Sequence, residues 1–259
     1  MKNLIADRWQ KYNFLFEQLV ARDFKQRYKR TYLGIVWSLL SPLLHLAVMV
    51  LVFVNFFGRT IPHFVVYVFI GLKVFTFFKE ATTRGMSSLV ANRNILTKIK
   101  APKYLFLLSK NVASLLNFGL MLIILFAFVL IDGVPIHPRF ILIVYPIFTL
   151  LLFNIGVGLI LSALYVFFKD IGHLYEIFAM LVMWLSAVFY DISNFSETVQ
   201  RLALINPIFT HIHFMRSVIL YGVVPEWYVF AICAAYAAAM LALGAFFYKR
   251  YNYKFLYYM

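Results

Sequence analysis

Long apolar segments recur along this chain and leave it few ways to fold. They occupy residues 35–57, 64–83, 105–131, 141–167, 174–190 and 227–247. Each is close to the roughly 20 residues that an α-helix needs to cross the hydrocarbon core of a bilayer. Charged residues make up only 13% of the chain, whereas a soluble domain carries about 25%. The sequence therefore predicts an all-α integral membrane protein, a single domain over residues 1–259 with six transmembrane helices.

The basic residues are placed unevenly around these segments. The formal net charge is +14, and Lys and Arg concentrate in residues 1–34, in residues 84–110 and after residue 248. Cytoplasmic flanks of transmembrane helices carry such an excess. The placement indicates a headgroup-facing basic surface rather than a nucleic-acid partner, and it predicts that both termini are cytoplasmic.

One further apolar stretch, residues 202–221, does not suit a simple span. It contains Asn206, Pro207, His211, His213 and Arg216, and polar groups of this kind rarely face lipid. If it did span, the basic C-terminus would lie outside, against the charge rule. We therefore expect residues 191–226 to form an outer re-entrant hairpin between spans five and six, with Asn-Pro as its turn. Such a backbone must be buried in protein or line a water-filled cavity.

The N-terminal segment, residues 1–33, reads as an amphipathic helix in the membrane interface. Its polar stripe comprises Gln18, Arg22, Lys25 and Lys29, opposite an apolar side. Asp23 and Arg27 fall on that apolar side at i,i+4 spacing, where a charge pair would need partners inside the protein. The helix is either a surface anchor with a local ion pair or an element that packs on the rest of the protein and fronts a substrate entrance.

Two charged positions inside the second apolar segment call for partners. Lys73 lies near mid-depth, where a lysine is costly and seldom faces lipid. It either faces a pore or pairs with an acidic group that the sequence does not identify. Glu80 is placed to pair with Arg84 at i,i+4 spacing.

Residue patterns that carry chemistry are missing from the sequence. It has no Gly-x-x-x-x-Gly-Lys-Ser/Thr loop to cradle nucleotide phosphates, no His-x-x-x-His pair and one cysteine, Cys233. We therefore expect no catalytic residue, no metal site and no cofactor in this chain.

Four motifs follow one another in a familiar order. They are RDFKQRYKRTYLGIVWSLLSPLL at residues 22–44, NRNILTKIKAP at 92–102, FFKDI at 167–171 and NPIFTHIHFMRSVI at 206–219. Together they resemble the membrane permease subunits of ABC-type polysaccharide exporters, which move O-antigen, capsule or teichoic-acid chains. One departure is Lys73 after Gly71-Leu72, where family members more often carry an apolar residue.

The resemblance implies a homodimer in the bacterial inner membrane that binds two cytoplasmic ATPase subunits. Those subunits would hold ATP and Mg, and the lipid-linked glycan would pass between the two permeases. O-antigen is the leading substrate, with a capsule or teichoic-acid polymer as the alternative. A gradient-driven secondary transporter is the rival from another class, and a membrane enzyme of glycan or lipid metabolism is disfavoured.

Three sets of residues are candidates for function. The resemblance makes residues 84–104 the segment that couples to the ATPase, with a short amphipathic helix before Pro102; an ordinary basic loop is the alternative. The coupling residues would be Asn94, Ile95, Leu96, Lys98, Lys100, Lys169 and Asp170. The lipid pyrophosphate could be held by Arg22, Lys25, Arg27 and Arg30, because guanidinium groups match phosphate oxygens; the same residues would equally attract anionic lipid. A glycan could slide over pore aromatics at Phe53, Phe56, Phe57, Trp184, Phe189 and Tyr190.

Overall fold

The computed structural model describes residues 2–28, 61–99, 101–193 and 195–258, together with isolated positions between 40 and 52. Side chains of the first helix are described for residues 12–26. The predicted first span, residues 35–57, lies outside the described residues apart from those isolated positions. Every secondary-structure element of the described ranges is a helix, which confirms the predicted all-α class.

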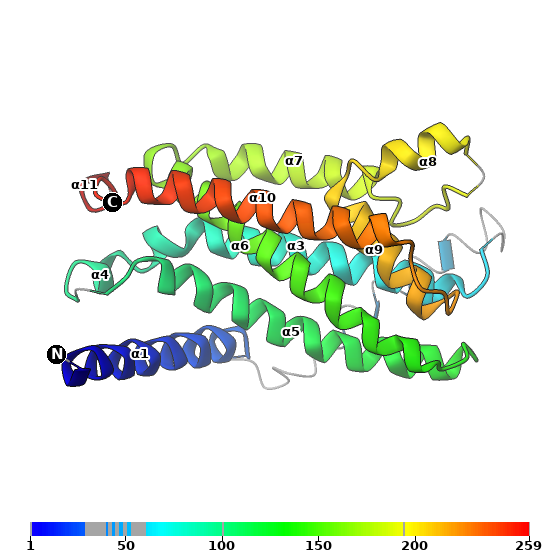
Figure 1. Ribbon diagram of the computed structural model, residues 1–259, viewed down its shortest axis with the longest axis horizontal. Helices are drawn as coiled ribbons and strands as arrows, with labels where there is room; N and C mark the ends of the chain where they lie inside the picture. Colours follow the sequence, from blue (N-terminus) through cyan, green and yellow to red (C-terminus); the bar gives the residue numbers. More distant parts are fainter. Residues whose placement is uncertain are drawn as a thin grey trace.

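The elements follow one another along the chain as labelled in Figure 1. They are α1 (Lys2–Tyr28), α3 (Phe64–Ala91), α4 (Arg93–Leu96), α5 (Tyr104–Ile131), η1 (Pro138–Ile143), α6 (Val144–Phe167), α7 (Ile171–Leu185), α8 (Glu197–Ala203), α9 (Pro207–Ile219), α10 (Trp227–Tyr251) and α11 (Phe255–Tyr258).

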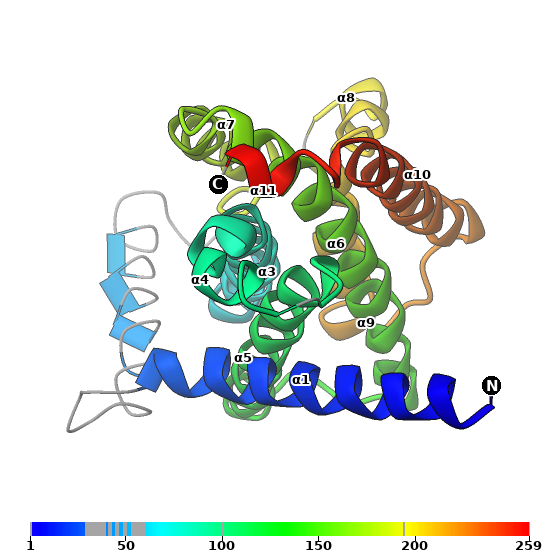
Figure 2. The same cartoon turned by 90° about the vertical axis from the view of Figure 1, so that its left-hand side faces the viewer.

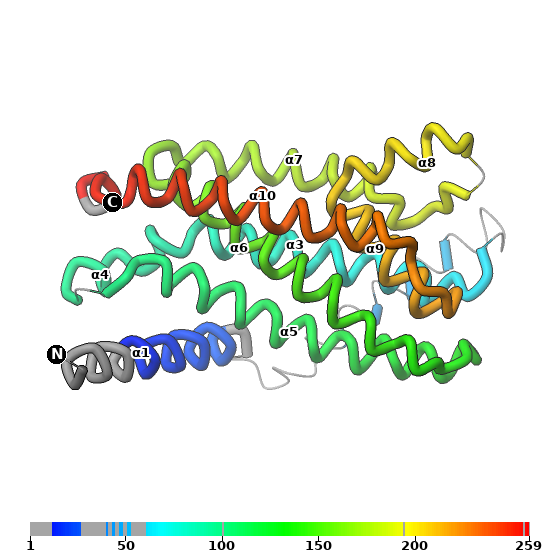
Figure 3. Tube along the Cα trace, in the orientation of Figure 1, coloured from blue at the N-terminus to red at the C-terminus, as the bar shows by residue number. Residues whose placement is uncertain are grey.

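The long helices form a bundle with two distinct ends. The tube in Figure 3 shows α3, α5, α6, α7 and α10 running along the long axis. We call the end that carries α4 and α11 the terminal end, and the opposite end, with α8 and the loop after α5, the far end. Figure 2, which looks onto the terminal end, shows α1 lying across the bundle beside α5. Helix α3 packs against α5, α6 and α9, and α6 also packs along α10.

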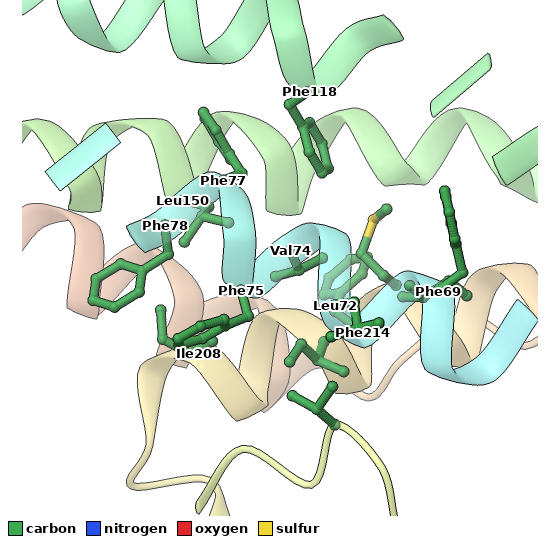
Figure 4. Close-up of a cluster of buried hydrophobic side chains, with 14 of the residues drawn as sticks. Phe69, Leu72, Val74, Phe75, Phe77, Phe78, Phe118, Leu150, Ile208 and Phe214 are labelled. Carbon is green, nitrogen blue, oxygen red and sulfur yellow. The ribbon is translucent and has the colours of Figure 1, made fainter. Parts of the chain in front are cut away.

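Helix α3 is the centre of the core. Nearly all of its residues from Val66 to Phe78 are buried, as expected of a helix that is apolar on every side. Figure 4 shows side chains from α5, α6 and α9 converging on it, among them Phe118, Leu150 and Phe214. Phe77 stacks on Phe118 with 4.9 Å between ring centroids. The core thus joins four helices from separate parts of the sequence.

Three of the described helices are long and apolar enough to cross a membrane by themselves. They are α5, the continuous η1–α6 unit and α10. The pair α8–α9 meets the same test when taken together, but it is bent by 108° at its break. Helix α3 carries four charged side chains, and α7 has only 15 residues, so neither is in this set. These helices support an integral membrane protein.

Helix α3 continues past the predicted end of its span at residue 83 and reaches Ala91. Arg84, the first residue of this extension, lies 3.5 Å from Glu80, which confirms the predicted pair. Glu80 also accepts hydrogen bonds from Ser114 and Asn117 of α5. The predicted second span was therefore too short, because the helix continues into the first part of the predicted connection over residues 84–104.

The predicted fifth span, residues 174–190, was wrong at its end. Helix α7 stops at Leu185, and a turn follows in which Ala187 has a φ of 48°. The carbonyl oxygens of Ala187 and Val188 accept hydrogen bonds from Arg216 instead of continuing a helical ladder. An arginine distant in the sequence therefore holds the turn that follows this helix.

Close contact between α6 and α10 depends on glycine. A Cβ atom built on Gly156 would overlap the backbone of Met240, and one on Gly244 would overlap the carbonyl oxygen of Gly156. Small residues at such crossings let two membrane helices approach closely. We expect Gly156→Ala to lower the free energy of unfolding by about 1–3 kcal/mol, because backbone atoms cannot move aside as side chains can.

The matched control is Gly119→Ala in α5, where a Cβ atom would meet no atom within 4 Å. This change should leave stability unchanged or raise it by up to about 1 kcal/mol, since alanine favours the helix. Thermal unfolding of both variants in detergent provides the comparison. Equal melting temperatures for the two variants would contradict the tight crossing.

Candidate functional site

A buried carboxylate attaches α1 to the bundle. Asp23 is 1% exposed and lies 2.8 Å from the Lys110 amine of α5. It also accepts hydrogen bonds from the Ser109 hydroxyl at 3.0 Å and from Arg22 at 2.9 Å. Leu19, one turn earlier, is buried in an apolar cluster with residues of α5. The sequence left open whether this helix is a surface anchor or packs on the rest of the protein. The structure shows that it packs on α5.

The same cluster reaches the start of α4. Arg22 donates a hydrogen bond from Nη2 to Oδ1 of Asn92 at 2.8 Å. Asn92 in turn donates from Nδ2 to the carbonyl oxygen of Ser88 at 2.7 Å. Because Asn92 lies between α3 and α4, the chain Asn92–Arg22–Asp23–Lys110 connects α4 with α1 and α5. We call these four residues the terminal-end network.

The candidate coupling residues gather at the terminal end. The structure contains the predicted short helix as α4, which ends at Leu96, ahead of Pro102. Among the candidates, Asn94, Lys98, Lys169 and Asp170 are exposed, Ile95 is half-buried and Leu96 is buried, while Lys100 lies outside the described residues.

Two contacts hold both candidate segments beside the C-terminal region. Lys103 donates a hydrogen bond to the carbonyl oxygen of Asn252 at 2.5 Å, and burial lowers the pKa of this lysine. The ring of Phe167 lies 5.8 Å from that of Tyr251. The structure thus brings the loop before α5 and the turn after α6 to one surface.

The candidate phosphate ligands are in part engaged elsewhere. Arg22 is bonded to Asp23 and Asn92, so it is not a free guanidinium, whereas Lys25 is exposed. The side chain of Arg27 and the whole of Arg30 lie outside the described residues. Phosphate binding at this helix stays a prediction.

The described candidate pore aromatics differ in their exposure to solvent or lipid. Trp184 and Tyr190 are 53% and 38% exposed, whereas Phe189 is buried. The Tyr190 hydroxyl donates a hydrogen bond to the Trp184 carbonyl oxygen at 2.9 Å, which keeps the two close. Phe53, Phe56 and Phe57 lie outside the described residues. A passage role for Trp184 and Tyr190 is compatible with their exposure and stays a prediction.

Lys73 is buried at 8% exposure, and its amine lies 4.8 Å from the centroid of the Phe69 ring. This cation–π contact offsets part of the cost of placing a lysine in an apolar core. The side chain thus extends along α3, beside a residue one turn earlier.

Sequence reasoning missed the role of Arg216. This α9 residue is 4% exposed, and it donates hydrogen bonds to the carbonyl oxygens of Ala187, Val188 and Tyr67 at 2.9–3.3 Å. Its guanidinium lies 3.4 Å from the Tyr67 ring centroid. Its position in an otherwise apolar stretch was the available signal, but the sequence analysis used it only to exclude a simple span.

The bend ahead of α9 is capped by the residue expected at the turn. The Asn206 side chain accepts hydrogen bonds from the backbone N–H groups of Ile208 and Phe209. Pro207 occupies the first turn of α9, where its missing N–H costs nothing. The Asn-Pro pair therefore starts α9 at the sharp bend after α8.

Comparison with known proteins extends over most of this structure. The profile of the family described as ABC-2 type transporter matches residues 15–220, from α1 to the end of α9. The chain belongs to the ABC-2 type transporter family. This membership confirms the resemblance that the four motifs suggested.

Several ABC-2 relatives are named for polysaccharide export. The chain is 30% identical to an O-antigen export system permease protein, RfbA, of Myxococcus xanthus over 78% of this chain and 77% of the relative. It is 26% identical to RfbA of Klebsiella pneumoniae over 85% and 87%, respectively. The capsule polysaccharide export inner-membrane protein CtrC of Neisseria meningitidis is 24% identical over 73% and 72%.

Membership of the ABC-2 family has direct consequences for the class of this protein. Its relatives are permease subunits of transporters rather than enzymes. The family also implies an ABC-type ATPase as partner.

Proposed function

We propose that this chain is the membrane-spanning subunit of an ATP-driven exporter of lipid-linked polysaccharide in a bacterial inner membrane. The observation that carries the proposal is similarity to O-antigen export permeases over as much as 85% of the chain. O-antigen is the first candidate substrate because those relatives are more similar than the capsule exporters. Capsule polysaccharide is the second.

The proposed architecture has six spans: residues 35–57, α3, α5, η1–α6, α7 and α10. The bent pair α8–α9 is then re-entrant. Its support is the bend of 108° between the two helices and the burial of most residues of α9. Helix α8, which has no buried residue, would lie at the outer surface.

The proposed orientation puts the terminal end in the cytoplasm. The described residues of that end include Lys98, Lys103, Lys169, Lys249, Arg250 and Lys254, whereas the far end has Arg139 and Arg201 on its described loops and short helices. This asymmetry follows the positive-inside rule.

Single cysteines test the orientation in a Cys233→Ser background. We expect Val199→Cys, in exposed α8, to react with a membrane-impermeant maleimide in intact spheroplasts. Tyr257→Cys, which replaces a side chain that is 87% exposed in α11, should react only after permeabilisation. The opposite labelling pattern would overturn the proposed orientation and with it the location of the coupling surface.

In the proposed assembly two copies of this chain bind two ATPase subunits, which hold ATP and Mg, and the glycan passes between the copies. Each ATPase would contact α4 and the Lys169-Asp170 turn. A push on α4 would reach α1 and α5 through the terminal-end network, because Arg22 bonds directly to Asn92. The energy of nucleotide hydrolysis would thus act on helices that are bonded together.

Deletion of the gene in the producing cell tests the function. We expect lipid-linked polymer to accumulate on the cytoplasmic side while polymer disappears from the cell surface, and the wild-type chain should restore it. A deletion strain with normal surface polysaccharide and no internal accumulation would refute the proposal.

A further inference from the structure

The far end contains a cavity of about 560 Å³. It lies between the loop at Asp191–Ser193, the helices α8 and α9, and residues 221–228. Figure 1 shows these elements gathered around α8 and α9, away from the terminal end. Its volume is within the range of about 300–1,000 Å³ that is usual for small-molecule sites.

Aromatic side chains form one part of the cavity wall. Tyr221 and Tyr228 line it and are 54% and 38% exposed, so their rings are accessible. His213 stacks on Phe209, with 5.8 Å between the ring centroids and 20° between the planes. Exposed ring faces next to polar tips offer a platform for the apolar C–H face of a sugar.

The polar part of the wall is dominated by carboxylates. Asp191, Glu197 and Glu226 line the cavity together with Gln200. Carboxylate and amide groups accept hydrogen bonds from neighbouring hydroxyl groups. Burial and the nearby Asp191 raise the pKa of Tyr221, so its hydroxyl remains a neutral donor.

The two arginines of the cavity are already engaged. Arg201 lies 3.6 Å from Glu197, and Arg216 is buried under bonds to three backbone carbonyl groups. Three carboxylates and two arginines line the cavity, so its wall is acidic by one formal charge. Arg201 and Glu197 offset each other and Arg216 is buried, so an anionic ligand would meet the carboxylates of Asp191 and Glu226. Within the described residues no group of three His, Cys, Asp or Glu side chains is placed to hold a metal ion, so a cation site does not explain the acidity.

We propose that this cavity binds neutral or amino-bearing sugar residues of the exported glycan and discriminates against glycans rich in uronic or sialic acid. The inference rests on the proposed export function and adds a substrate class to it. Tyr221 and Tyr228 stack on the sugar rings, while Asp191 and Glu226 accept their hydroxyl or ammonium protons. Repulsion by the carboxylates supplies the discrimination against acidic sugars.

Binding is measured by calorimetry on the full chain with its ATPase partner in nanodiscs, without nucleotide. The probes are maltoheptaose, a chitosan hexamer and hexagalacturonate. We expect the first two to bind, and hexagalacturonate to bind at least about tenfold more weakly. Tyr228→Ala should weaken maltoheptaose binding by about tenfold. Tyr257→Ala, at the exposed tyrosine of the terminal end, should have no effect.

A charge variant separates recognition from folding. Glu226→Gln should improve hexagalacturonate binding and leave maltoheptaose binding nearly unchanged, whereas Glu17→Gln on α1 should change neither. Equal binding of the acidic and neutral probes, or a Tyr228→Ala variant with wild-type affinity, would overturn the inference.

Failure of the inference can be told apart from failure of the proposed function. If the chain exports glycan with ATP but binds the acidic and neutral probes equally, only the cavity proposal is refuted. A deletion strain that keeps normal surface polysaccharide and accumulates none internally refutes the export function itself.

Discussion

Asp23→Ala is expected to lower the free energy of unfolding by about 3–5 kcal/mol, because it leaves the Lys110 ammonium largely buried without its counter-charge. The Asp23 side chain is fully buried, and that of Lys110 is 13% exposed. The change also removes one of the two acceptors near the Ser109 hydroxyl and one of the two partners of Arg22. Chemical denaturation of the purified chain, monitored by tryptophan fluorescence, measures the loss.

Two variants define the cause of that loss. Asp23→Ala combined with Lys110→Met removes the buried carboxylate and its most buried cation, and it should recover a large part of the lost stability. The remaining cation, Arg22, is 39% exposed and keeps its hydrogen bond to Asn92. Glu17→Gln alters an exposed carboxyl group on the same helix and should change stability by less than about 0.5 kcal/mol. A double variant no more stable than Asp23→Ala would contradict the buried ion pair.

Arg216→Met is expected to cost about 3 kcal/mol or more and to loosen the turn after α7. Methionine fills a similar volume but donates no hydrogen bond. It leaves the carbonyl oxygens of Tyr67, Ala187 and Val188 without their donor, at about 1–3 kcal/mol for each buried group. Limited proteolysis within residues 186–196, with thermal unfolding in parallel, reports both effects.

Arg201→Met is the matched control, because this arginine lies near the same cavity but its side chain is 82% exposed. Its ion pair with Glu197 is a surface pair, worth about 0–1 kcal/mol. Arg216→Lys should be intermediate, since one ammonium cannot reproduce the planar fork that reaches several carbonyls. Similar protease sensitivity of Arg216→Met and Arg201→Met would show that the carbonyl contacts do not hold the turn.

The sequence predicted those parts of the fold that apolar length determines. The span expected at 105–131 is α5, which begins at Tyr104 and ends at Ile131. The prediction failed where tertiary contacts decide the boundary. Helix α3 continues beyond its apolar stretch, where Arg84 pairs with Glu80 and Arg22 of α1 bonds to Asn92 just after the last turn. Helix α7 ends early and is followed by a turn whose carbonyl groups bond to Arg216.

The candidate site was predicted only where a local pattern reveals it. Amphipathic periodicity placed Asp23 on the buried side of α1, and its burial confirms this. Its partner Lys110 is 87 positions away, and no local pattern can report a pairing at that distance. The link from Arg22 to Asn92 was hidden for the same reason.

Glu80, the acidic side chain of α3, helps to distinguish an ATP-driven exporter from a gradient-driven transporter. A gradient-driven carrier uses intramembrane carboxylates or proton relays. Glu80 is bonded to Arg84, Ser114 and Asn117, which is the environment of a structural carboxylate. This favours an energy source outside the chain.

Reconstitution tests the central claim, namely that this chain forms a passage driven by a separate ATPase bound at its terminal end. Proteoliposomes that contain the chain with its ATPase should move lipid-linked glycan to the opposite leaflet only when ATP is hydrolysed, as measured by access of an added glycosidase. A Walker-lysine variant of the ATPase should abolish movement. Glycan transport by the chain alone, driven by a proton or sodium gradient, would contradict the account.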